Sequence, residues 1–227
     1  MIRNPHNYDS LVALGEYMDY VPYDVTPSEL YNAQTLYEGY DPSRPDTLDN
    51  CYDSRVYRHF CKTGKRAFSA KESLARSLHD HGISHALYEF LATYDQRSVI
   101  GIMGGHGLKR TDPMYAEIVR LSKQLTQQGF LMISGGGPGA MEATHLGAWL
   151  AGQPDKELPA VLNRLSVAPS FTDAGWMTSA FSVIRDYPQT RYRSLGIPTW
   201  LYGHEPSTPL ATHIAKYFDN SIREDGI

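Results

Sequence analysis

Two glycine-rich segments, each expected between a strand and a helix, are the parts of this 227-residue chain best suited to chemistry. The first reads Gly104-Gly105-His106-Gly107, and the second reads Gly135-Gly136-Gly137-Pro138-Gly139 and continues into Ala140-Met141-Glu142. Small residues allow the backbone to approach a phosphate group, and the N-terminus of a following helix offers free N–H groups and a partial positive charge. The two segments therefore predict a site for a nucleotide or another phosphorylated ligand.

The glycines of both segments also admit a simpler interpretation as tight turns. In the first segment, a turn between a strand and a helix explains the glycines as well as a ligand does. The second segment has more backbone freedom than a turn needs, at an entropic cost on folding, which favours a close ligand. Neither segment spells G-x-G-x-x-G or a Walker A motif, which disfavours NAD and ATP, and no cofactor is expected.

Polar residues beside these segments are candidates for contacting a ligand. His106 could donate to a phosphate or a base, although an ordinary exposed loop histidine explains it equally well. Lys109 and Arg110 could pair with phosphate or only with solvent. Glu142 could meet a ribose hydroxyl or simply complement the N-terminus of its helix. Glu205 follows a predicted strand and is expected at the same edge of the sheet.

A metal site is not expected from the histidines and cysteines. In His79-Asp80-His81, residues two apart on a helix point to different faces, so we interpret this run as a solvated C-terminal turn of a helix. Cys51 and Cys61 belong to no CxxC motif or Cys/His cluster, so neither a zinc site nor a disulfide framework is implied. Free thiols of this kind are typical of a reducing compartment.

The second glycine segment resembles a known enzyme family. The resemblance rests on Gly135-Gly136-Gly137-Pro138-Gly139-Ala140-Met141-Glu142-Ala143, preceded by Gly104-Gly105-His106. These residues are similar to the nucleotide 5′-monophosphate nucleosidases and, more broadly, to the LOG family of cytokinin riboside 5′-monophosphate phosphoribohydrolases, often misnamed lysine decarboxylases. The matching core spans residues 97–152, about a quarter of the chain, and a weaker match covers 197–226. The resemblance implies a Rossmann-like fold, a homo-oligomer, and hydrolysis of a nucleoside 5′-monophosphate into base and ribose 5-phosphate.

The resemblance also identifies which parts of the family's catalytic site are present. The family takes its catalytic carboxylate from a second motif, PGGxGTxxE, which this sequence lacks. Arg223 matches the family's assisting arginine, and Glu224 stands where the LOG branch often has a lysine. Either the chain is a fragment whose next strand would carry the motif, which we favour, or it is a non-catalytic nucleotide-binding sensor or carrier. The chain as given is expected to bind nucleoside monophosphates and to hydrolyse them slowly or not at all.

Strands and helices in the right order are needed to position these residues. Short apolar runs at 98–103 and 130–134 predict two buried strands, each followed by a glycine segment and then by a helix, at 112–128 and 140–150. Met114, Ile118, Leu121 and Leu125 recur at helical spacing in the first of these helices. The order predicts an α/β fold with a Rossmann-like doubly wound parallel sheet and both glycine segments at one edge.

The remaining sequence has weaker patterns. Downstream, a strand is predicted at 158–167, a helix at 174–186, a strand at 197–203 and a last helix beginning at Thr208. Upstream, the chain is irregular to about residue 53. Ser69 and Glu72 then predict a capping box for a helix ending at Gly82, with a second helix from residue 84. We therefore divide the chain into an N-terminal extension, 1–95, and a nucleotide-binding domain, 96–227.

Composition excludes several classes of function. The formal net charge of −4 argues against non-specific nucleic-acid binding, which depends on an excess of Lys and Arg. No apolar stretch approaches the length that crosses a membrane, and the N-terminus has no apolar run of a targeting peptide. The cytoplasm is therefore the expected location, with a nucleoside monophosphate or a related small phosphorylated molecule as the expected ligand.

Overall fold

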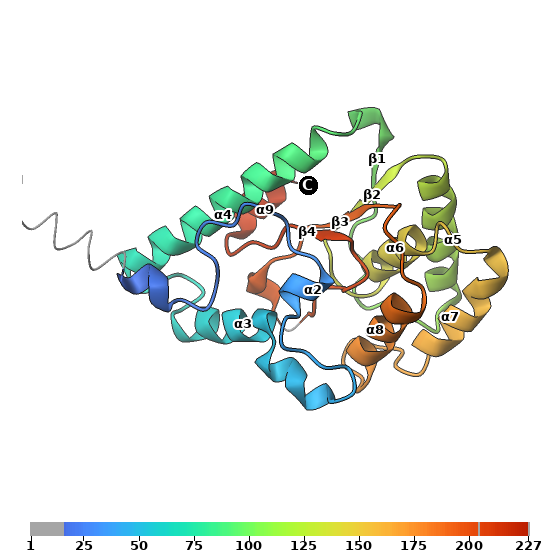
Figure 1. Ribbon diagram of the computed structural model, residues 1–227, viewed down its shortest axis with the longest axis horizontal. Helices are drawn as coiled ribbons and strands as arrows, with labels where there is room; N and C mark the ends of the chain where they lie inside the picture. The colour runs from blue at the N-terminus through green and yellow to red at the C-terminus, as the bar shows by residue number, and fades with distance from the viewer. Residues whose placement is uncertain (1–15, 204, 227) are drawn as a thin grey trace, which may run out of the picture.

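The computed structural model describes residues 16–203 and 205–226, which form an α/β fold around a four-stranded, all-parallel sheet (Figure 1). The strands are β1 (Val99–Gly101), β2 (Leu131–Ser134), β3 (Ser194–Gly196) and β4 (His213–Ile214), and they lie side by side in that order. Strand β1 pairs with β2 in parallel, with Ile100 opposite Met132. The predicted parallel pairing of the first two strands is therefore confirmed.

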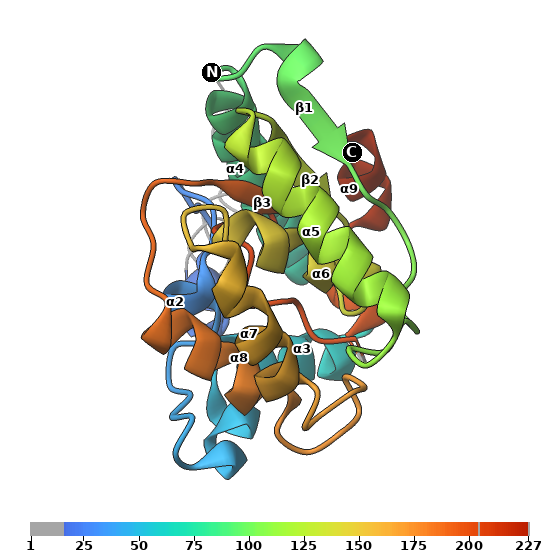
Figure 2. The same ribbon diagram turned by 90° about the vertical axis from the view of Figure 1, so that its right-hand side faces the viewer.

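Four helices follow β1 and β2 in the chain; the first two pack on one face of the sheet, and the other two share a hydrophobic cluster with them (Figure 2). They are α5 (Pro113–Gln127), α6 (Ala140–Trp149), α7 (Leu158–Leu165) and α8 (Trp176–Asp186). Asp112 begins α5 by accepting the N–H of Met114 at 2.8 Å, and Pro113 occupies the first turn, where a missing N–H costs nothing. Helices α5 and α6 approach closely at Gly147, where a Cβ atom would lie 2.6 Å from that of Ser122.

The opposite face is covered by the N-terminal extension and the last helix. These elements are α2 (Ala33–Leu36), α3 (Tyr52–Lys62), α4 (Ala70–Leu91) and α9 (Asn220–Asp225). The described residues also form short 3₁₀ helices: η1 (Pro45–Asn50), η2 (Gln96–Ser98), η3 (Asp155–Glu157) and η4 (Trp200–Tyr202). No helix within the described ranges has both the length and the hydropathy of a membrane-spanning segment.

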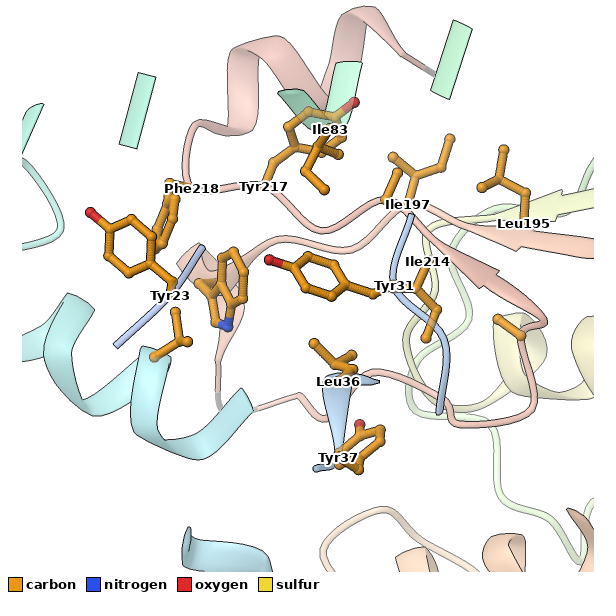
Figure 3. Packing of buried hydrophobic residues seen from close by; sticks show 14 of the residues in the cluster. Tyr23, Tyr31, Leu36, Tyr37, Ile83, Leu195, Ile197, Ile214, Tyr217 and Phe218 are labelled. Atoms are coloured by element: carbon orange, nitrogen blue, oxygen red, sulfur yellow. The ribbon is translucent and has the colours of Figure 1, made fainter. Parts of the chain in front are cut away.

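The extension and the sheet share one hydrophobic core. Leu131 and Ile133 of β2 and Leu195 of β3 belong to the same buried cluster as Ile83 and Leu87 of α4. Figure 3 shows that the extension also contributes aromatic rings to this cluster, among them Tyr23, Tyr31 and Tyr37. The division at residue 95 stays a prediction about domains, but the hydrophobic packing crosses it.

A short stretch of the extension also covers the edge of the sheet. The N–H of Tyr31 donates to the carbonyl oxygen of Ile214 in β4 at 3.0 Å, and the N–H of Ile214 donates back at 2.7 Å. This antiparallel bridge satisfies backbone groups that an open edge would leave unpaired. The bridge therefore holds Tyr31 of the extension against the β4 edge of the sheet.

Three downstream predictions are wrong. The strand predicted at 158–167 is helix α7, whose buried Leu158, Val161 and Leu165 recur at helical spacing. In place of a strand at 197–203, the structure has β3 at 194–196 and then η4, which the Thr199 side chain caps. The long helix predicted from Thr208 is also absent, because residues 213–214 form β4 and a helix begins only at residue 220.

The helical part of the extension also differs from its prediction. Helix α4 continues through Gly82, which is not a C-cap; a Cβ atom there would lie 2.5 Å from the carbonyl oxygen of Pro27. Gly82 therefore allows the extension to approach the helix. Ser69 accepts the N–H of Glu72 at 3.2 Å as predicted, but the Glu72 carboxylate binds Arg76 and His59 within the core.

Candidate functional site

The two glycine loops meet at the carboxyl edge of the sheet, where β1 and β2 end. The N–H of Ala140 at the start of α6 donates to the carbonyl oxygen of Gly105 at 3.1 Å, which joins the second loop to the first. Positive φ angles of 71° at Gly105, 72° at Gly136 and 72° at Gly139 explain why glycine occupies these turns. The predicted location of both loops at one edge is confirmed.

Arg223 reaches the second loop from helix α9. A Cβ atom on Gly135 would lie 2.8 Å from Nη2 of Arg223 and 2.9 Å from the sulfur of Met141. The guanidinium is held by the carbonyl oxygen of Ile197, which accepts from Nε at 2.7 Å, and by Glu224 at 2.8 Å from Nη1. The resemblance singled out Arg223 from sequence, and the fold brings this cation to the glycine loop.

Helix α9 is itself fixed by a buried carboxylate of the extension. Asp80 on α4 accepts the backbone N–H groups of Phe218 at 3.0 Å and of Asp219 at 2.8 Å, immediately before α9. His79 donates from Nδ1 to Asp80 at 2.8 Å, and its Nε2 contacts the hydroxyl of Tyr31 at 2.8 Å. His79 and Asp80 are buried in the middle of α4, so the prediction of a solvated helix end is wrong for both.

Glu205 and His106 lie close to each other at this edge of the sheet. One oxygen of Glu205 is 3.7 Å from the position of a Cβ atom on Gly137, and the other is 3.8 Å from Nδ1 of His106. The Glu205 side chain is 20% exposed and that of His106 is 61% exposed, so both are accessible to a ligand. A carboxylate and an imidazole thus lie beside the two glycine loops.

Glu142 is withdrawn from the site. Its carboxylate forms a bidentate ion pair with Arg110, which donates from Nε at 2.9 Å and from Nη2, and it accepts the hydroxyl of Tyr115 at 2.9 Å. Burial, together with the charge of Glu142, raises the pKa of Tyr115 well above its usual value, so Tyr115 remains a neutral donor. Arg110 and Glu142 follow the two glycine loops, and their pairing clamps the loops together in place of binding a ligand.

The second glycine loop is buried, whereas the first is exposed. A Cβ atom on Gly136 would lie 2.8 Å from the ring of Pro198, and one on Gly137 would lie 2.8 Å from the terminal methyl of Met141. Two of the predicted phosphate donors are already used, because Gly136 donates to Ser134 at 2.9 Å and Ala140 donates to the first loop. This leaves the N–H groups of Gly137 and Gly139 as the candidate donors, since Pro138 has none.

A buried histidine behind the second loop was missed in the sequence. His145 on α6 contacts the hydroxyl of Ser134 at 2.7 Å through Nε2 and that of Ser194 at 2.9 Å through Nδ1. Its sequence signal is weak, since a histidine inside an apolar helix is most often a satisfied core residue. Ser134, however, directly precedes the glycines, and this position was the available clue.

The site residues therefore divide into two groups. Those that the fold brings together are the two glycine loops, Met141, Arg223, His106 and Glu205; those turned away into the core are Glu142 and Arg110. No cluster of three or more His, Cys, Asp or Glu side chains suited to a metal ion occurs in the part of the chain that the structure describes. No family model matches the chain, and no match is found among curated proteins or solved structures.

Proposed function

We propose that this chain binds a nucleoside 5′-monophosphate at the edge formed by the glycine loops and hydrolyses its N-glycosidic bond. The observation that carries the proposal is the convergence of Arg223 with two adjoining glycine loops at the carboxyl ends of parallel strands. Ligands of open α/β sheets bind at this edge, and a guanidinium beside free backbone N–H groups suits a phosphate. The products are the free base and ribose 5-phosphate.

The proposal includes a Rossmann-like, doubly wound sheet. It is supported by the parallel pairing of the strands and by the glycine loops that follow β1 and β2. The four described strands follow one another in chain order, so a doubly wound sheet would need a further strand beyond β1, where the order reverses. A homo-oligomer and a cytoplasmic location, which the sequence suggested, also remain part of the proposal.

The phosphate is proposed to lie between Arg223 and the N–H groups of Gly137 and Gly139. Met141 lies against Gly135 and Gly137 of the loop, and its side chain is proposed to rotate to admit the phosphate. Methionine suits this role because it is unbranched and has several rotatable bonds. The arginine needs no such change, because its Nη2 already lies beside Gly135.

Glu205 is the proposed catalytic carboxylate, in place of the one from the absent PGGxGTxxE motif. With Glu205 in this role we propose turnover by the chain as given, whereas the absence of the motif alone predicts slow hydrolysis or none. The position of Glu205 supports the assignment, because one of its oxygens lies 3.7 Å from the position of a Cβ atom on Gly137. Glu142, by contrast, is withdrawn into the core beside Arg110, and Glu224 is 57% exposed on α9. Cleavage of the bond passes through an oxocarbenium-like sugar, which a carboxylate stabilises while it activates water.

The bonds that change are few. Water adds to C1′ of the ribose, the electron pair of the C–N bond leaves with the base, and the base takes up a proton. His106, whose Nδ1 is 3.8 Å from Glu205, is the proposed donor of that proton. Glu205 receives the proton that the attacking water releases.

The test is to incubate the protein with AMP, CMP, GMP and UMP and to detect base and ribose 5-phosphate by chromatography. Glu205→Gln should lower the rate by about 10²-fold or more while calorimetry still shows nucleotide binding. Arg223→Ala should weaken binding itself. Glu89→Gln, an exposed glutamate on α4, is the matched control and should change neither. Wild-type turnover in Glu205→Gln would refute the assigned carboxylate, and absence of nucleotide binding by the wild-type protein would refute the function.

A non-catalytic nucleotide sensor or carrier is the second candidate. It is favoured by the absence of the PGGxGTxxE motif from the sequence. The same experiment distinguishes the two candidates, because a sensor would bind nucleoside monophosphates with measurable affinity and release no base.

A further inference from the structure

Three fully buried polar side chains form a chain of contacts beneath the second glycine loop. Ser134 ends β2, Ser194 begins β3, and His145 of α6 lies between their hydroxyl groups, with contacts of 2.7 and 2.9 Å. All three are 0% exposed. Buried polar groups of this kind are costly unless each finds a partner, so the contacts hold the side chains in fixed rotamers.

The chain of contacts continues into the backbone of the loop. The hydroxyl oxygen of Ser134 accepts the N–H of Gly136 at 2.9 Å, and the carbonyl oxygen of Gly136 accepts the N–H of Thr208 at 2.8 Å. Gly136 is thereby held from both sides in its conformation with φ of 72°. The direction of the loop beyond Gly136 depends on these two hydrogen bonds.

A neutral imidazole is suited to this position. It has one donor and one acceptor nitrogen, so it donates to one serine hydroxyl and accepts from the other. Burial lowers the pKa of His145 to about 3, so the ring stays neutral at ordinary pH. A leucine at this position would leave both hydroxyls without their histidine contact and would free the Ser134 side chain to rotate.

We propose that His145 is a positioning residue of the nucleotide site, which orients Ser134 so that its hydroxyl holds the Gly136 peptide and thereby sets the second glycine loop. Its consequence for ligand affinity rests on the proposed function, whereas its effect on the loop does not. The competing interpretation is that the same contacts only tie β2, α6 and β3 together. The two serines test the link to the loop, because both contact His145 but only Ser134 contacts the loop, and variants of His145 test whether the histidine acts through that link.

The experiment compares Ser134→Ala with Ser194→Ala in the full chain. Both variants remove one hydroxyl from His145, and they should lose similar thermal stability. In ¹⁵N-resolved hydrogen exchange, the Gly136 amide should exchange at least about tenfold faster in Ser134→Ala than in Ser194→Ala, because only the first loses its acceptor. Calorimetry with AMP should show about tenfold weaker binding for Ser134→Ala alone.

His145→Leu and His145→Gln complete the test. His145→Leu should accelerate exchange at Gly136 as Ser134→Ala does, and His145→Gln, which keeps a donor and an acceptor, should restore part of the protection. If His145→Leu does not fold, His145→Ser, which loses the contact with both serine hydroxyls in a smaller side chain, is compared with His145→Gln, and equal exchange at Gly136 in wild type and both of these variants would overturn the proposal. Equal exchange at Gly136 in the two serine variants would overturn the proposal. If the wild-type protein binds no AMP, the proposed function fails, while the exchange data still test His145.

Discussion

The contact between the two glycine loops predicts that Gly139 tolerates no side chain. Gly139 has φ of 72° and ψ of −126°, which L-residues with a Cβ atom rarely adopt. A Cβ atom there would overlap the carbonyl oxygen of Gly105 and lie 2.9 Å from that of His106. Both obstacles are backbone atoms, so no side-chain rotation relieves them, and Gly139→Ala must push the loops apart.

The expected cost follows from two contributions. Forcing alanine into this conformation costs about 1–3 kcal/mol. Separating the loops also breaks the hydrogen bond from Ala140 to Gly105, worth about 1 kcal/mol. Gly139→Ala should therefore lower the free energy of unfolding by about 2–4 kcal/mol, a large part of the roughly 5–15 kcal/mol of a typical domain.

Gly104→Ala is the matched control in the first loop. Gly104 also has a positive φ, 78°, but a Cβ atom there meets no other atom within 4 Å. Gly104→Ala should lower the free energy of unfolding by about 1–2 kcal/mol, from backbone strain alone. Urea denaturation of both variants, followed by tryptophan fluorescence at one pH, measures the difference. If Gly139→Ala is as stable as Gly104→Ala, the loops do not touch as described and the reasoning fails.

Three further predictions concern buried polar groups. Arg110→Met should lower the free energy of unfolding, measured by urea denaturation, by about 3–5 kcal/mol because it leaves the buried Glu142 carboxylate without its ion-pair partner. The double variant Arg110→Met/Glu142→Leu should recover part of this loss, and additive losses would contradict the pairing. Folding lowers the pKa of His145 from 6.5 to about 3, so at a pH between these two values the imidazole is protonated only in the unfolded chain. The free energy of unfolding should therefore fall as the pH drops from about 6.5 towards 3. His145→Gln should reduce proton uptake on unfolding in this range by about one; an unchanged pH slope would contradict the assignment. Asp80→Ala should lower the free energy of unfolding by about 2 kcal/mol because it removes the acceptor of two backbone N–H groups before α9. His81→Ala, at an exposed position, should change it by less than about 0.5 kcal/mol, and equal losses would refute the role of Asp80.

The elements predicted correctly are those whose signals are local. Strands β1 and β2 are short apolar runs that end at glycines, and α5 begins with an aspartate cap and a proline. Strand β3, by contrast, contains only Ser194, Leu195 and Gly196 and has no apolar run to reveal it. It is a strand because it pairs with β2 and β4, a long-range property that single-sequence patterns do not carry.

Helix α5 is predicted correctly, but the face that it buries is not the one that its apolar residues indicate. The apolar residues Met114 and Leu121, which helped to predict the helix, are 57% and 49% exposed. The buried face instead carries Tyr115, Val119 and Lys123. Tyr115 reaches Glu142, and Lys123 is buried against the turn after α6, so tertiary partners outside the helix decided the face. The spacing of apolar residues within one helix does not indicate which residues elsewhere in the chain will contact it.

The candidate site divides in the same way between local and long-range causes. The glycine loops are local motifs and were recognised, whereas the Arg110–Glu142 pair joins residues 32 positions apart and was not. Lys109 and Arg110 are neighbours in sequence and carry the same charge, yet Arg110 is buried and Lys109 is exposed. Only the fold distinguishes a guanidinium that clamps the loops from a cation that remains in solvent.

The geometry at α9 gives the N-terminal extension a part in the site that its irregular sequence did not indicate. Asp80 is buried in the core that α4 shares with the sheet, and its carboxylate accepts two backbone N–H groups just before α9. The direction of α9 determines where the Arg223 guanidinium lies, because Nε is bound to Ile197 and Nη2 reaches Gly135. The packing of α4 therefore controls the position of the cation beside the glycine loop. An extension that only shielded the sheet would need apolar contacts alone, whereas a buried charge bound to the start of α9 fixes the orientation of the helix that carries Arg223.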